Sequence, residues 1–239
     1  MASATRPPAL TPAADAAGGT AVRDAASIIL WRPGPTGPEV LMGQRGKGAV
    51  FMPEKVVFPG GAVDPEDSGL PFPAPLDPDS ARRLALESEP GLAEAVVLAG
   101  IRELWEEAGL RLALPAPDPL PALPPGWQDF SAGGFRPHTE AMRFVFRAIT
   151  PPGRPRRFDA RFFLVEAREI ADPAEDFTAA SGELGSLRWL PLAATQDLPL
   201  PFITGIVLAE IETRLADPDG AHPVPFFDNR GDESRFLLL

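Results

Sequence analysis

The sequence contains no cysteine, and its 239 residues include only two histidines. Without cysteine there can be no disulfide framework, no thiolate zinc site and no cysteine nucleophile. His138 and His222 have no second histidine at metal-ligand spacing, so we interpret both as surface residues. Every catalytic or metal site that depends on a thiolate is therefore excluded.

Basic residues are also scarce, because 22 Lys and Arg stand against 33 Asp and Glu, a net charge of -11. Proteins that follow a nucleic-acid backbone need clustered cations. No segment approaches the ~20 apolar residues that span a bilayer, and residues 1–22 lack the apolar run of a secretory signal. We expect a cytoplasmic protein with no nucleic-acid partner and no membrane partner. Residues 1–22 are predicted to form a flexible tail.

Hydrophobic residues make up 44% of the chain, which suits one globular domain. Periodicity and turn residues predict a hairpin, a Pro-Gly-Gly turn after a third strand, and further strands and helices. The predicted strands are 25–32, 39–44, 55–58, 142–149, 161–167 and 187–190, and the predicted helices are 81–89 (capped by Ser80), 92–110 and 203–215. A Pro-rich connector covers 115–126. This order predicts the α+β class, with α/β/α layering around a mixed sheet. The domain would span 23–216, followed by a tail over 217–239.

The helix at 92–110 is unusually acidic on one side. At about 100° per residue, Glu103, Glu106 and Glu107 share a face, while Ile101, Leu104, Trp105 and Ala108 lie opposite. A solvated charged face is the ordinary interpretation of such a helix. Three clustered carboxylates are, however, natural ligands for Mg²⁺ or Mn²⁺.

Three neighbouring features favour the metal interpretation. Glu94 precedes Arg102 by eight positions, Gly109-Leu110 follow the acidic face, and Phe58-Pro59-Gly60-Gly61 lies upstream. The segment from Glu94 to Leu110 resembles the second half of the Nudix box, and Phe58 to Gly61 resembles its beginning. Gly61 and Glu94 are 33 positions apart where the family has 6, which indicates an insertion of 27 residues, at about 67–93. Glu66, six after Gly60, is judged too far from Arg102 in sequence to be its partner. A box split in this way is similar to the coenzyme A diphosphatase branch. The stretch from Arg45-Gly46 to Phe51-Met52-Pro53 and the stretch from Arg157 to Phe163 also resemble that branch.

The resemblance implies a Nudix hydrolase that cleaves a diphosphate linkage in a small nucleoside diphosphate derivative, with Mg²⁺ or Mn²⁺ as cofactor and a homodimer as an option. It implies metal ligation by Glu103, Glu106, Glu107 and the Gly60 carbonyl, with Glu94 and Arg102 orienting the ligands. Glu183 is the favoured general base, with a solvated loop carboxylate as the equal alternative. The inserted segment is expected to loop out beside the site and shape substrate access. The dense basic cluster is expected to grip substrate phosphates, or else to balance nearby carboxylates; it comprises Arg154, Arg156, Arg157 and Arg161.

Several alternatives remain beside the coenzyme A hypothesis. An ADP-ribose or NADH pyrophosphatase would use the same box, and a non-catalytic nucleotide-binding module would keep the fold. An isopentenyl diphosphate isomerase resembles the family but needs a catalytic cysteine, which this chain lacks. RNA decapping is disfavoured by the net charge of -11.

Overall fold

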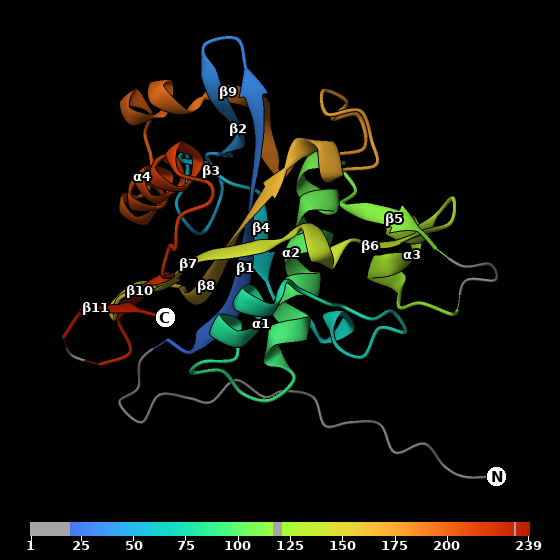
Figure 1. Ribbon diagram of the computed structural model, residues 1–239, viewed down its shortest axis with the longest axis horizontal. Coiled ribbons are helices and arrows are strands. Elements are labelled where there is room, and N and C mark those ends of the chain that lie inside the picture. Colours follow the sequence, from blue (N-terminus) through green and yellow to red (C-terminus); the bar gives the residue numbers. More distant parts are fainter. Residues whose placement is uncertain (1–19, 117–120, 232) are drawn as a thin grey trace.

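A mixed β-sheet runs through the molecule between two long helices (Figure 1). The computed structural model describes residues 20–116, 121–231 and 233–239. The strands are β1 (Val22–Gly34), β2 (Gly37–Arg45), β3 (Val56–Val57), β4 (Gly60–Ala62), β5 (Ala113–Pro115), β6 (Phe135–Pro137), β7 (Arg143–Ile149), β8 (Arg157–Glu166), β9 (Leu184–Pro191), β10 (Pro225–Asp228) and β11 (Arg235–Leu238). The α-helices are α1 (Pro78–Leu84), α2 (Leu92–Ala108), α3 (Pro125–Ser131) and α4 (Phe202–Ala216).

The sheet has the order β11-β10-β7-β8-β1-β2-β3, with β4 paired to β1 and β9 paired to β2. β1 runs parallel to β8 and β7 parallel to β10, whereas the β1–β2, β2–β9 and β7–β8 pairs are antiparallel. β5 and β6 form a separate small sheet. The predicted α+β class, with a mixed sheet between helices, is confirmed. Among the described segments, no helix is long and apolar enough to cross a bilayer.

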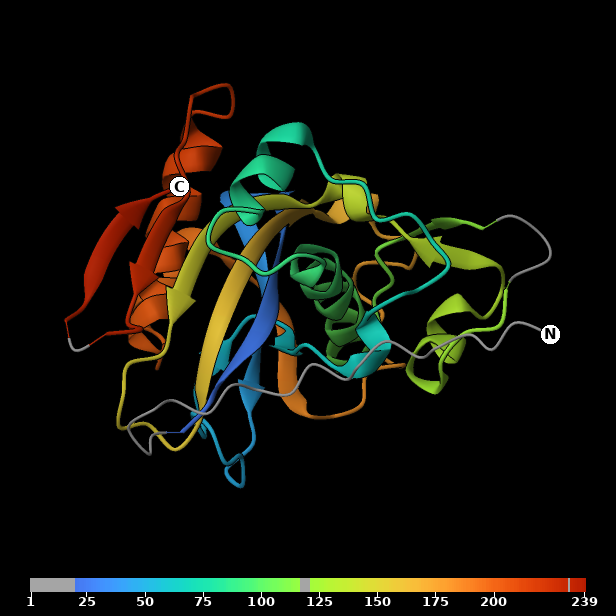
Figure 2. The same cartoon turned by 90° about the horizontal axis from the view of Figure 1, so that it is seen from below.

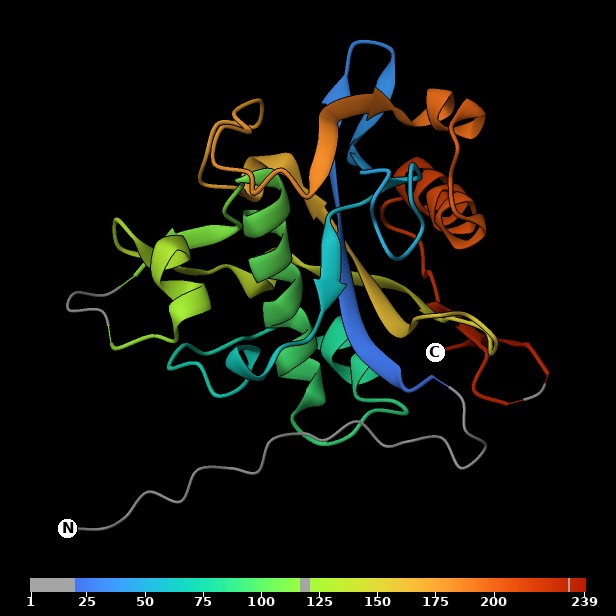
Figure 3. The same cartoon turned by 180° about the vertical axis from the view of Figure 1, so that it is seen from behind.

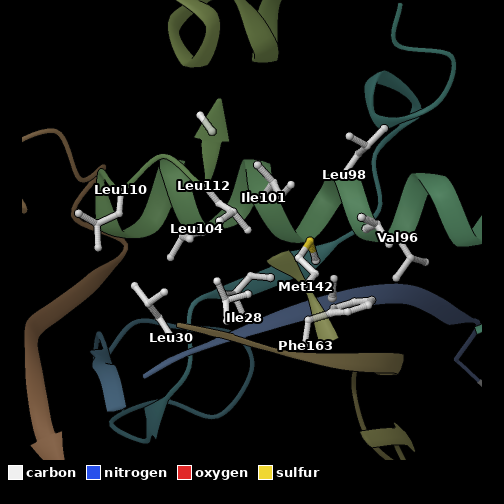
Figure 4. Close-up of a cluster of buried hydrophobic side chains, with 14 of the residues drawn as sticks. Ile28, Leu30, Val96, Leu98, Ile101, Leu104, Leu110, Leu112, Met142 and Phe163 are labelled. Carbon is white, nitrogen blue, oxygen red and sulfur yellow. The ribbon is translucent and has the colours of Figure 1, made fainter. Parts of the chain in front are cut away.

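The two faces of the sheet carry separate halves of the core. Figure 2 shows α2 on one side and α4 on the other. On the α2 side, residues such as Ile28, Ile101 and Phe163 are fully buried (Figure 4). On the α4 side, Ile29, Phe162 and Val207 form the corresponding cluster. Neighbouring residues of one strand thus serve opposite faces, as the two-residue period of a strand requires.

The N- and C-terminal predictions have different outcomes. Residues 1–19 of the predicted tail lie outside the described residues, and Val22 already begins β1. The predicted C-terminal tail over 217–239 is wrong, because residues 225–228 and 235–238 form β10 and β11 at the edge of the sheet. A four-residue strand offers too short a pattern to be distinguished from a loop by periodicity.

The segment between the two box halves also departs from expectation. It packs on the core rather than looping out, because Leu70, Phe72 and Leu84 are buried against the α2 side of the sheet. Its helix covers 78–84, not 81–89, and Asp77 caps it by accepting hydrogen bonds from the backbone N–H groups of residues 79 and 80. Ser80 instead accepts a hydrogen bond from the Phe144 N–H at 2.9 Å, which ties α1 to β7. Within the predicted connector 115–126, residues 117–120 lie outside the described residues and α3 begins at Pro125.

Candidate active site

The acidic face belongs to the C-terminal half of α2, whose end is fixed by Gly109. Gly109 has a φ of 70°, and its N–H donates to the Trp105 carbonyl at 2.8 Å. A Cβ at Gly109 would lie 2.8 Å from the backbone nitrogen of Ala180, so glycine lets the loop at 177–181 approach the helix. In that loop the Ser181 N–H donates to the Glu106 carbonyl at 2.7 Å. The helix end and the loop that leads to Glu183 are therefore held together.

The glycine turn approaches the acidic face closely. β4 lies between β1 and α2 (Figure 3), and the Gly60 N–H donates to Oε2 of Glu107 at 2.7 Å. A Cβ at Gly61 would overlap the carboxylate of Glu103, so this contact requires a residue without a side chain. The two halves of the split box therefore meet, as predicted, although 33 positions separate Gly61 from Glu94.

Glu107 is buried, the side chain of Glu103 is 15% exposed, and both have raised pKa values. Burial raises the pKa of Glu107 to about 8; the Gly60 N–H opposes this rise, and Glu103 and Glu183 add to it. Burial likewise raises the pKa of Glu103 to about 7, with Arg102 opposing. The pKa of Glu106 is also raised, mainly by burial, and Arg102 again opposes. Ionising these carboxylates together is therefore unfavourable in this end of α2, and an additional cation would stabilise their ionised forms.

Arg102 is buried and its principal partner is Asp67, not Glu94. Its Nε and Nη2 donate to the two Asp67 oxygens at 2.8 and 3.0 Å, and its Nη1 donates to Glu103 and Glu106 at 3.0 Å each. Burial works to lower the pKa of Arg102, but these ion pairs outweigh it and raise the pKa. Glu94 is exposed in the first turn of α2. The predicted orienting role of Glu94 is therefore wrong, while that of Arg102 has a physical basis in its contacts.

The residues of this face fit a divalent cation in their chemistry. Glu103, Glu106 and Glu107 offer the carboxylate oxygens that Mg²⁺ and Mn²⁺ prefer, and the pKa of each is raised. As they stand, no group of three or more Asp, Glu or His side chains within the described ranges is arranged to hold a metal ion. Glu103 and Glu106 are turned toward Arg102 and Glu107 toward the Gly60 N–H, so ligation would require these side chains to reorient.

Glu183 lies beside the acidic face, at the residue before β9. Its side chain is 58% exposed, and its Oε1 accepts a hydrogen bond from Nη2 of Arg45 at 2.9 Å. Its negative charge contributes to the raised pKa values of Glu103 and Glu107, which places it within electrostatic range of both. The position is compatible with a base at the site, and the role itself stays a prediction.

The predicted phosphate-binding arginines are not gathered at this face. Arg161 is 1% exposed and pairs with Asp24 and Asp159. Arg157 is 5% exposed and donates to the carbonyls of Thr150 and Asn229 at 3.0 Å each. Both arginines therefore hold strands together rather than face a substrate, which corrects the prediction for these two. Arg154 and Arg156 are exposed on the turn between β7 and β8.

Sequence reasoning missed two residues of the site. Asp67 stands six positions after Gly61, the spacing that the box itself uses for its glutamate, and that count would have found it. Arg45 ends β2 opposite Leu184 of β9, a neighbour relation that only the strand register shows.

The mixed sheet between helices, with a carboxylate-bearing helix packed on a Gly-Gly turn, resembles known Nudix structures. The NUDIX hydrolase of Alicyclobacillus acidocaldarius has a similar crystal structure, with a TM-score of 0.57 and 29% identity over 80% of this chain and 90% of that one. The chain is also 29% identical over 188 residues to "Putative nudix hydrolase 7" of Caenorhabditis elegans, a match covering 70% of this chain and 51% of that protein. No family model matches the chain.

The fold is therefore the Nudix fold, and both similarities support a Nudix hydrolase. The chain spans about half the length of the curated relative that it matches. The relatives do not identify a substrate.

Proposed function

We propose that this chain hydrolyses a diphosphate linkage in a nucleoside diphosphate derivative, with Mg²⁺ or Mn²⁺ as cofactor. The observation that carries the proposal is the acidic face, where Glu103, Glu106 and Glu107 share one side of α2. Against the Gly60-Gly61 turn lie the buried Glu107 and the half-buried Glu103, both with raised pKa values. Buried carboxylates at this density are costly for stability unless a cation joins them, which favours function over packing as their reason.

The residues have separate tasks in this proposal. Glu103, Glu106, Glu107 and the Gly60 carbonyl would hold the cation, which would neutralise charge on the phosphate oxygens and help to ionise the attacking water. The pair of Asp67 and Arg102 anchors one oxygen of Glu103 and one of Glu106, and would limit how far these carboxylates turn to reach the cation. In the hydrolysis the water oxygen forms a bond to phosphorus, the bridging P–O bond breaks, and the proton of the water passes to Glu183.

Coenzyme A or an acyl-coenzyme A is the finer substrate that we propose. Its support is the resemblance of the split box, together with Arg45-Gly46 and Phe51-Met52-Pro53, to the coenzyme A diphosphatase branch. The argument from an arginine cluster no longer contributes, because Arg157 and Arg161 are buried in other contacts. ADP-ribose and NADH are the competing substrates, since they contain the same diphosphate linkage.

The test is a hydrolysis assay with the purified protein and Mg²⁺ or Mn²⁺. The panel should hold coenzyme A, acyl-coenzyme A, ADP-ribose, NADH, dinucleoside polyphosphates and nucleoside triphosphates, with products identified by mass. Cleavage within a diphosphate linkage is expected, with the highest kcat/KM for a coenzyme A compound. Preference for ADP-ribose or NADH would overturn the coenzyme A proposal alone. Binding without cleavage of any compound would indicate a non-catalytic module.

A further inference from the structure

Arg45 lies at the edge of the acidic face in a firmly held position. Its backbone N–H donates to the Lys55 carbonyl at 2.9 Å, and its carbonyl accepts from the Glu54 N–H at 3.1 Å. It is the register partner of Leu184, the residue after Glu183. The guanidinium thus meets Glu183 across two paired strands, and the backbone on both sides is fixed.

The hydrogen-bonding capacity of Arg45 is only partly used. A guanidinium carries five N–H donors. The side chain is 20% exposed, and its Nη2 donates to Glu183. The buried Nε has no hydrogen-bond partner among the described residues. An unsatisfied buried donor costs about 1–3 kcal/mol and calls for a reason. Because Nε is shielded from solvent, it would reach the acceptor oxygens of a ligand only if the guanidinium turned away from Glu183.

The surroundings indicate which ligand fits. Arg45 lowers, and Glu183 raises, the pKa of Glu107, so both charges act on the same acidic face. The other guanidinium at this face, that of Arg102, already contacts carboxylate oxygens of Asp67, Glu103 and Glu106. Arg45 therefore has spare donors close to the carboxylates of the proposed active site. Two oxygens of a phosphate can accept two parallel hydrogen bonds from one guanidinium. A phosphate can therefore compete with the half-exposed Glu183 carboxylate for the Arg45 guanidinium.

We propose that Arg45 binds a phosphate of the substrate, and that this contact replaces its ion pair with Glu183 and leaves the Glu183 carboxylate free for the attacking water. The inference rests on the proposed function and adds to it a substrate-binding residue and an order of events. Before substrate arrives, Arg45 and Glu183 neutralise each other. Once the diphosphate is bound, Arg45 faces the phosphate and Glu183 faces the water.

The test measures the Kd of a nucleoside diphosphate whose bridging oxygen is replaced by CH₂, α,β-methylene-ADP, by calorimetry with Mg²⁺ present. Arg45→Gln should weaken binding at least tenfold, because a charge-assisted contact is lost. Glu183→Gln keeps the shape of the side chain and removes its charge, so it should tighten binding several-fold by releasing Arg45. The double variant should bind like Arg45→Gln.

The matched control is the pair of Arg32 and Glu175, a surface ion pair of the same kind in which Glu175 is 71% exposed. Arg32→Gln and Glu175→Gln should leave the Kd unchanged, and circular dichroism should show that all variants are folded. An unchanged Kd in Arg45→Gln, or weaker binding in Glu183→Gln, would overturn the proposed role of Arg45. Hydrolysis of a diphosphate by the wild type would still support the proposed function in that case. If the wild type neither bound the probe nor cleaved any diphosphate, both proposals would fail together.

Discussion

Replacing Asp67 by asparagine is expected to destabilise the protein strongly, because it leaves the Arg102 guanidinium buried without its main counter-charge. Asp67 is 0% exposed and Arg102 is 4% exposed, and two hydrogen bonds of 2.8 and 3.0 Å join them. Removing one member of such a buried pair costs about 3–5 kcal/mol. Asparagine has nearly the volume of aspartate and keeps an oxygen that can accept the hydrogen bond from the Asp64 N–H. The loss of stability therefore measures the effect of removing the negative charge.

The assay is urea unfolding of the cation-free protein, followed by the fluorescence of its 4 tryptophans. The expected loss in the free energy of unfolding is about 3–5 kcal/mol. In a chain of this length the same loss would lower the Tm in a thermal scan by about 6–20 °C. Glu94→Gln is the matched control and should change stability by about 0.5 kcal/mol or less, since Glu94 is exposed. Equal costs for the two variants, or a larger cost for Glu94→Gln, would refute the assignment of Asp67 as the partner of Arg102.

Three further outcomes are expected. Burial raises the pKa of Glu103 and Glu107 to about 7 and 8 in the folded protein, whereas the unfolded chain loses these protons above about pH 4.3. Because the folded state then binds more protons than the unfolded state, cation-free stability should fall as pH rises from about 5 to 8. Glu107→Gln should reduce this slope, and a urea midpoint that does not change with pH in the wild type would contradict it. Gly61→Ala should lower kcat at least tenfold by displacing the Glu103 carboxylate, unlike Gly48→Ala, where a Cβ meets no atom within 4 Å. Arg157→Ala should lower the urea midpoint without changing the ratio of KM values for coenzyme A and its dephosphorylated form, whereas a selective rise in the KM for coenzyme A would restore the phosphate-clamp prediction.

The long periodic elements could be predicted from the sequence, and the short ones could not. The helix ending at Gly109 and the hairpin of β1 and β2 follow from apolar spacing and turn residues. β10 and β11 have four residues each and are defined by pairing with β7 and with one another, which a local pattern does not contain. The helix α1 was predicted three residues late because Asp77 and Ser80 both suit a cap, and only the hydrogen bonds distinguish them.

The residues of the candidate site also differ in whether the sequence alone predicts their positions. One helix carries Glu103, Glu106 and Glu107, so helical geometry alone placed them on one face. Separation along the chain argues against Glu66 as a partner of Arg102, yet the fold brings the neighbouring residue Asp67 to Arg102 across 35 positions. Arg157 and Arg161 look like a basic patch when counted along the chain, yet strand β8 buries both side chains in other contacts. Charge in a sequence does not reveal burial.

The most direct test of the account is turnover by Glu106→Gln with the best substrate of the panel at saturating Mg²⁺. Glu106 is 41% exposed, so the substitution should leave the far-ultraviolet circular dichroism and the urea midpoint close to those of the wild type. The account predicts that kcat falls by orders of magnitude, because a carboxylate that holds the cation is lost. A folded Glu106→Gln protein with a near-wild-type kcat would contradict the assignment of the acidic face as the active site.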